Sequence, residues 1–274
     1  MTDRVREAFE NARKDGRIAL VPFLTVGHPT VEASIASARA VVDAGADALE
    51  LGVPFSDPLA DGPVIQMSSF KALEQGVTVA TCIGAARQLR AEGVTVPIIL
   101  MGSYNPILSY GLAEFCTDAA AAGVDGLIVS DLPTEETGPL LAEAKPAGLS
   151  LVPLLALTSS EERIQSACRE ASGFIYCVAA LGVTGARESV SDRVRGLVAD
   201  VRRNASLPAA VGFGISTAEH VAEVATFADG AVVGSALVRA LDDGPPETAP
   251  QRARDFIEGL AAGTRLPGAG IGGT

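Results

Sequence analysis

Two carboxylates, Glu50 and Asp61, lie in a setting that favours acid–base chemistry. Glu50 is part of a short apolar segment, residues 48–52, which the sequence predicts to be a buried strand. Burial raises the pKa of a carboxyl group towards the neutral range, where the group can donate and accept protons. Asp61 follows eleven residues later in a loop, so both groups can face one pocket. The alternative is that Glu50 is an exposed edge residue, but the leucines on either side indicate a strand covered on both faces.

Two glycine-containing runs have the composition of phosphate-binding loops: residues 212–216, GFGIS, and the pair Gly234 and Ser235. Glycine lets a phosphate approach backbone N–H groups, and a helix that starts nearby adds its amino-terminal dipole. Neither run contains Lys or Arg. We therefore expect backbone amides and the Ser235 hydroxyl to hold a phosphate, with Gly214 and Gly234 allowing its approach. As simple helix caps, the same glycines would need no ligand.

The elements that must position these residues alternate from end to end of the chain. Short apolar runs predict strands, and alanine-rich amphipathic segments between them predict helices. Eight such units imply a single-domain α/β fold, a (β/α)8 TIM barrel, with a short extra helix at the amino terminus. An open doubly wound sheet is the alternative, but no G-x-G-x-x-G run follows the first strand. The expected strands cover residues 19–24, 48–52, 97–101, 126–130, 149–154, 174–178, 209–212 and 231–234.

Active sites of such barrels lie at the carboxyl ends of the strands, where the unusual residues of this chain gather. Asn105 follows the third strand, Asp131 ends the fourth and Tyr176 lies in the sixth. The loop 182–187, GVTGAR, places Thr184 between two glycines, of which Gly185 is one. This pattern suits a lid that closes over a bound substrate. An ordinary loop with glycine turns is the alternative.

Composition excludes several classes of protein. The 274 residues carry a formal charge of −12, which argues against a nucleic-acid partner. No apolar run approaches the roughly 20 residues that span a bilayer, and the charged amino terminus lacks the apolar core of a signal peptide, so we expect a cytoplasmic protein. Four scattered cysteines and two histidines show no metal-site spacing, and we expect no metal. We expect the barrel to cover residues 1–262 and a glycine-rich, flexible tail to follow at 263–274.

Several sequence motifs, which occur in the expected order along the chain, resemble those of a known family. The run GVPFSDPLADGP at residues 52–63 is the most specific, and the chain resembles the tryptophan synthase alpha chain over roughly residues 15–262. This resemblance implies retro-aldol cleavage of indole-3-glycerol phosphate to indole and glyceraldehyde 3-phosphate, without metal or organic cofactor. The other matching motifs are PFLTVGHP at 22–29, MGSYNPI at 101–107, VSDLP at 129–133, LGVTGAR at 181–187, GFGIS at 212–216 and VVGSALV at 232–238.

The resemblance also implies roles for individual residues. Glu50 matches the general acid–base residue of the family, and Asp61 matches the partner of the indole N–H. The apolar walls for the indole ring would be Phe23, Met101 and Phe213. Tyr176 would orient Glu50, and Thr184 would meet Asp61 when the lid closes.

A partner follows from the same resemblance. Alpha chains of this family work in an α2β2 complex, in which the tryptophan synthase beta chain receives indole through an internal tunnel. The loop 54–63 would face the beta chain, with Asp57 and Pro58 at its tip. Two alternatives remain open: a free-standing indole-releasing lyase, and a catalytically weak chain that mainly activates its partner. Glu50 and Asp61 argue against the second, because a scaffold has no use for buried carboxylates.

Overall fold

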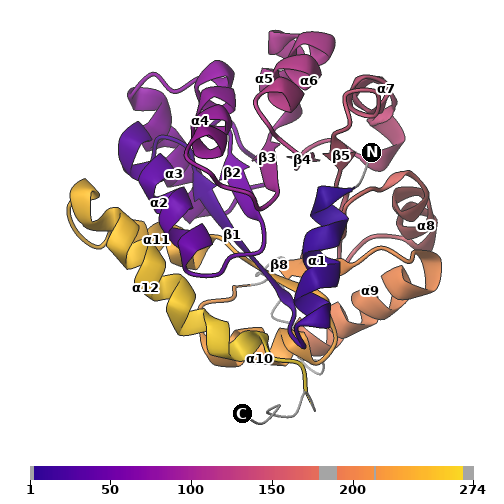
Figure 1. Cartoon of the computed structure of the whole chain (residues 1–274). Helices are drawn as coiled ribbons and strands as arrows, with labels where there is room; N and C mark the ends of the chain where they lie inside the picture. The colour runs from indigo at the N-terminus through magenta and orange to yellow at the C-terminus, as the bar shows by residue number, and fades with distance from the viewer. Residues whose placement is uncertain (1–2, 179–189, 213, 268–274) are drawn as a thin grey trace.

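The described strands of this computed structural model form one curled sheet of parallel strands surrounded by helices (Figure 1). The structure describes residues 3–178, 190–212 and 214–267. The sheet order is β5-β4-β3-β2-β1-β9-β8-β7-β6. The strands are β1 Ala19–Thr25, β2 Leu49–Gly52, β3 Ile98–Gly102, β4 Gly126–Val129, β5 Ser150–Leu151, β6 Leu154–Ala156, β7 Ile175–Val178, β8 Ala209–Gly212 and β9 Gly230–Val233.

Residues 150–156 close the sheet into a barrel. On one side β5 pairs with β4, and the Val152 N–H donates to the Leu127 carbonyl at 3.0 Å. On the other side β6 pairs with β7, and the Pro153 carbonyl accepts from the Tyr176 N–H at 3.0 Å. The sequence predicts a single strand here, but Pro153 has no N–H to donate, and the structure has two short strands around it. The predicted (β/α)8 barrel is confirmed, with its fifth strand split.

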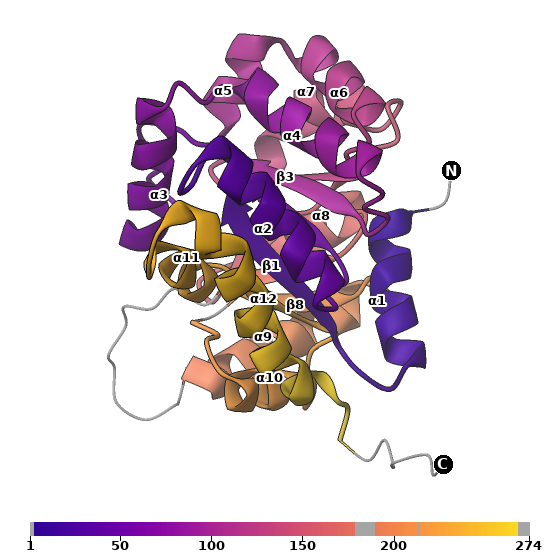
Figure 2. The same cartoon turned by 60° about the vertical axis from the view of Figure 1, so that its left-hand side comes forward.

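Helices cover the outside of the barrel (Figure 2). Helices are present between the strands, as the alanine-rich segments predict, and a 3-10 turn at Thr134–Glu136 precedes one of them. The helices α3, α5 and α12 do not stand out in the sequence pattern. The helices are α1 Arg4–Lys14, α2 Val31–Asp43, α3 Pro63–Glu74, α4 Val79–Ala91, α5 Tyr104–Tyr110, α6 Leu112–Ala121, α7 Gly138–Ala144, α8 Glu161–Glu170, α9 Val190–Asn204, α10 Ala218–Ala225, α11 Ser235–Asp242 and α12 Ala249–Ala261. No helix of these described ranges is long and apolar enough to cross a membrane.

Three aspartates repeat one contact at the amino-terminal ends of the strands. Each stands just before a strand, accepts a hydrogen bond from the backbone N–H of a residue in the neighbouring strand and pairs with an arginine. Asp125, for example, accepts from the Ile98 N–H at 2.9 Å and pairs with Arg90 and Arg4. The contact fixes each strand end to its neighbour. The other two sets are Asp47 with Leu20 and Arg17, and Asp229 with Ala209 and Arg202.

Helix α1 forms the floor of the barrel (Figure 1). Its apolar residues Val5, Phe9 and Ala12 are buried in a cluster of inward-facing strand residues. The Phe9 ring lies 4.9 Å from that of Phe174, which lies 6.1 Å from that of Tyr176. A stack of aromatic rings therefore runs along the barrel interior from the floor towards the opposite end.

The packed part of the chain extends beyond residue 262. Gly263 and Thr264 are buried, and the Thr264 carbonyl accepts from the Ile18 N–H at 2.8 Å. The Leu266 N–H donates to the Gly16 carbonyl at 2.8 Å. Residues 263–266, which the sequence analysis assigns to the tail, are therefore packed against the rest of the chain, and residues 268–274 lie outside the described residues.

Candidate active site

A cavity of about 650 Å³ opens at the carboxyl ends of the strands. Eight of the residues singled out from the sequence line it, which brings the two carboxylates and the glycine-containing runs into one space. They are Phe23, Glu50, Asp61, Met101, Tyr176, Gly214, Gly234 and Ser235. Thr184, Gly185 and Phe213 lie outside the described residues. Asp57, Pro58 and Asn105 do not line this cavity.

Glu50 is buried inside the barrel. It lies opposite Phe23 of β1 and Ile99 of β3, so its strand is paired on both sides. Leu49 and Leu51 belong to the apolar core around the outside of the sheet, and alternation along the strand points Glu50 inwards. The side chain is 0% exposed, and neither carboxyl oxygen has a hydrogen-bond partner among the described residues. Glu50 is therefore not an exposed edge residue. Its burial raises the pKa of the carboxyl group to about 8.

Asp61 is held in the loop that joins β2 to α3. The Asp61 N–H donates to the Pro58 carbonyl at 3.0 Å, and the Asp61 carbonyl accepts from Gln66 Nε2 at 2.8 Å. Because Gln66 belongs to α3, the first turn of that helix fixes the backbone of Asp61. Burial, and then the charge of Asp131, raises the pKa of Asp61 to about 6. Asp61 is thus largely ionised at neutral pH while Glu50 is largely protonated.

Two glycines make room for the aromatic walls of the cavity. A Cβ atom at Gly52 would lie 2.5 Å from Phe23 Cζ, and one at Gly212 would overlap the Tyr176 hydroxyl. Burial, and then the charges of Glu50 and Asp61, raises the pKa of Tyr176 well above its usual range. No hydrogen bond joins Tyr176 to Glu50 in the described structure. The orienting role expected for Tyr176 stays a prediction.

The glycine-containing runs form one end of the cavity. Gly214 has a φ of 47°, in the left-handed region that favours glycine. Gly234 immediately precedes α11, and Ser235 is the first residue of that helix. Ser216, the last residue of the GFGIS run, and Arg239 also line the cavity. Arg239 is not among the residues predicted from the sequence. The spacing of four residues between Ser235 and Arg239 is the signal that could have found Arg239, since it places both on one helix face.

A second cavity of about 350 Å³ adjoins the first, and Ala60 and Val178 line both. It lies between the ends of β4 and β6 and helix α8, and Asp131 lines it. Asp131 also accepts a hydrogen bond from the Tyr104 N–H at 2.7 Å, which fixes the start of α5. Asp131 therefore lines the adjoining cavity and not the main one.

The fold and this cavity define an enzyme of the (β/α)8-barrel class with paired carboxylates at the mouth of the barrel. The family model described as tryptophan synthase alpha chain matches residues 9–263. The chain therefore belongs to the tryptophan synthase alpha chain family, as the sequence motifs predict, and it is a lyase of tryptophan biosynthesis.

The chain is similar to individual relatives over nearly its whole length. It is 47% identical to the tryptophan synthase alpha chain of Chloroflexus aurantiacus, covering 96% of this chain and 99% of that one. It is 44% identical to the tryptophan synthase of Saccharomyces cerevisiae, covering 97% of this chain but 38% of that longer protein. Among solved structures, a chain of the Mycobacterium tuberculosis tryptophan synthase superposes with a TM-score of 0.88 at 37% identity, covering 97% of this chain and 100% of that chain.

Proposed function

We propose that this chain cleaves indole-3-glycerol phosphate to indole and glyceraldehyde 3-phosphate, as the alpha subunit of a tryptophan synthase. Breaking the carbon–carbon bond requires a proton at indole C3, loss of the proton from the side-chain hydroxyl and stabilisation of charge on the indole nitrogen. The cavity supplies a group for each of these requirements. The observation that carries the proposal is the unpartnered burial of Glu50 beside an ionised Asp61.

Glu50 is the proposed general acid–base residue. With its pKa raised to about 8, it holds a proton at neutral pH and can deliver it to indole C3. The carboxylate that results is poorly solvated and has no partner among the described residues, so it is a strong base for the substrate hydroxyl. Proton delivery and removal by one side chain leave Glu50 ready for the next turnover.

Asp61 is the proposed partner of the indole N–H. As a carboxylate it accepts that hydrogen bond and stabilises positive charge on the ring nitrogen after C3 is protonated. Phe23 and Met101 line the same cavity and are the proposed apolar walls for the indole ring. The phosphate lies at the opposite end, against Gly214, Gly234 and Ser235, where the start of α11 provides N–H donors.

Indole release from indole-3-glycerol phosphate tests the proposal. Replacing Glu50 with Gln keeps the shape and removes proton transfer, so the rate should fall roughly 10²–10⁴-fold. Glu32, an exposed carboxylate on α2, provides the matched control, and Glu32→Gln should cleave at the wild-type rate. Retention of more than about a tenth of the wild-type rate by Glu50→Gln would show that Glu50 is not the acid–base residue.

We also infer that a beta chain docks on the mouth of the barrel. Four large apolar side chains are exposed there, on the β2–α3 loop, on α3 and on α5, which follow the neighbouring strands β2 and β3. They are Leu59 at 92% exposure, Met67 at 54%, Phe70 at 58% and Leu108 at 52%. A patch of this kind next to an active site favours an interface over a free-standing enzyme. The four cysteines are free thiols, in keeping with a cytoplasmic location.

The tip of the loop should couple docking to catalysis. The Leu59 N–H donates to the Asp57 carbonyl at 2.9 Å, and the Pro58 carbonyl accepts from Asp61, so a contact at the tip reaches the catalytic carboxylate through the backbone. Asp57→Ala and Pro58→Gly should weaken activation by the beta chain while leaving substrate binding to the isolated chain near its wild-type level. Full activation of both variants would contradict this coupling.

A further inference from the structure

Arg239 is the only lysine, arginine or histidine among the described residues that line the main cavity. The same cavity contains the carboxylates of Glu50 and Asp61, and the whole chain carries a formal charge of −12. A substrate with a phosphate dianion therefore approaches a protein whose overall field repels it. A single cation at the cavity acts against this repulsion at the point of binding.

The position of Arg239 on α11 directs it towards the phosphate end. Arg239 lies one helical turn after Ser235, on the same face, and both line the cavity. Long side chains in a helix point back towards its amino terminus and cover the preceding turn. The guanidinium group can therefore reach the space in front of Gly234 and Ser235.

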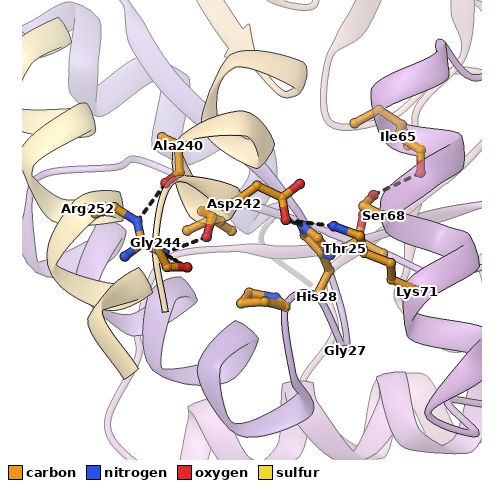
Figure 3. A network of polar contacts seen from close by, with 12 residues as sticks. Thr25, Gly27, His28, Ile65, Ser68, Lys71, Ala240, Asp242, Gly244 and Arg252 are labelled. Atoms are coloured by element: carbon orange, nitrogen blue, oxygen red, sulfur yellow. Dashed lines mark hydrogen bonds and ion pairs between the residues drawn. The ribbon is translucent and has the colours of Figure 1, made fainter. Parts of the chain in front are cut away.

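The neighbouring cations are engaged in structural contacts, whereas Arg239 is not. Arg252 donates to the Ala240 carbonyl near the end of α11 at 2.8 Å (Figure 3). It also donates to the Leu241 carbonyl at 2.6 Å. Lys71 of α3 pairs with Asp242 at 2.9 Å (Figure 3). Arg239 is exposed and forms no hydrogen bond or ion pair with any residue in the described ranges.

The geometry points to Arg239 as a ligand of the substrate phosphate, additional to the backbone amides and the Ser235 hydroxyl. This inference rests on the proposed lyase function and adds to it a cationic ligand outside the glycine-containing runs. A guanidinium group binds two phosphate oxygens at once and stays charged at every working pH. Because Arg239 lies with Ser235 at the phosphate end of the cavity, its contribution is to binding and to the rate of substrate capture.

Steady-state kinetics on the full chain, with and without a beta chain, test this role. Arg239→Gln should raise KM for indole-3-glycerol phosphate roughly tenfold, as expected for loss of one exposed charge-assisted contact, and leave kcat within about twofold. The dependence of kcat/KM on salt should become flatter, since the steering charge is gone. Arg239→Lys should recover part of the affinity, because it restores the charge but not the contact with two phosphate oxygens at once. Arg87→Gln removes the same charge from an exposed position on α4 outside the cavity and should change neither constant.

Calorimetric binding of glycerol 3-phosphate and of indole separates this inference from the proposed function. Arg239→Gln should weaken glycerol 3-phosphate binding and leave indole binding unchanged. If the wild-type chain released no indole while this selective loss persisted, the lyase function would fail and the phosphate role of Arg239 would stand. If Arg239→Gln bound glycerol 3-phosphate like the wild type, or if Arg87→Gln lost as much, the role of Arg239 would be refuted.

Discussion

The buried Glu50 should make the folded protein less stable as the pH rises. In the unfolded chain this group titrates near its ordinary pKa of 4.5, whereas in the folded protein burial raises the pKa to about 8. Between these values the unfolded chain has lost the proton and the folded protein still holds it. Ionisation therefore favours the unfolded state progressively from pH 4.5 to pH 8, and the penalty is constant above that range.

The size of the effect follows from the two pKa values. One pKa unit corresponds to about 1.4 kcal/mol, so the penalty is about 1 kcal/mol at pH 5 and about 4 kcal/mol at pH 8. Glu50→Gln removes the titration and keeps the shape of the side chain. The variant should exceed the wild type in free energy of unfolding by these amounts at the two pH values.

Urea unfolding followed by circular dichroism at pH 5 and pH 8 measures this difference. Glu32→Gln, on the exposed face of α2, is the control and should stay within about 0.5 kcal/mol of the wild type at both values. A gain for Glu50→Gln that is the same at both pH values would refute the reasoning, because packing and not titration would then explain it. A loss of stability at pH 8 would refute it as well.

Three further predictions concern other parts of the molecule. The kcat/KM for cleavage should rise through pH 6 and fall above pH 8, following the pKa values of about 6 and about 8; Asp61→Asn should remove the acidic limb, and its persistence would contradict the role of Asp61. Gly230→Ala should lower the free energy of unfolding, measured with urea, by about 1–3 kcal/mol, because its Cβ would lie 2.5 Å from Phe9 Cε1. The control Gly259→Ala places a Cβ with nothing within 4 Å and should be neutral or stabilising, so equal effects of the two variants would contradict the steric argument. Asp125→Asn should lower the free energy of unfolding by about 2 kcal/mol, because it weakens the contacts to the Ile98 N–H and to two arginines. An unchanged midpoint of urea unfolding would refute this prediction.

The sequence predicts the strands and the carboxylates well because their patterns are local. A parallel strand buried on both faces is a short apolar run, and Glu50 stands out within one as a charge among leucines. Helix α3 was missed because it has no single apolar stripe: Met67 and Phe70 are exposed on its outer surface. Pro106 lies within α5 and obscures the helical pattern there.

Contacts between distant segments could not be read from the pattern. The pairing of residues 150–156 with both β4 and β7 depends on closure of the whole sheet, which no local run encodes. Asp61 owes its raised pKa partly to Asp131, seventy residues away in the chain. In the sequence Arg239 is marked only by its four-residue spacing from Ser235, and the position of α11 in the fold is what places it beside the glycine-containing runs.

The position of α1 has a consequence for how the chain is made. This helix is complete after residue 14, but the inward-facing strand residues that it covers include Val232 of β9, and Phe9 lies against Gly230. At about 5–20 residues per second, the remaining residues up to β9 take on the order of 10–40 seconds to synthesise. During that interval the barrel is incomplete, so the apolar side chains of Val5, Phe9 and Ala12 are not yet buried. A chain stalled before residue 230 therefore presents the uncovered apolar face of an amphipathic helix near its amino terminus, which is the kind of surface that a chaperone binds.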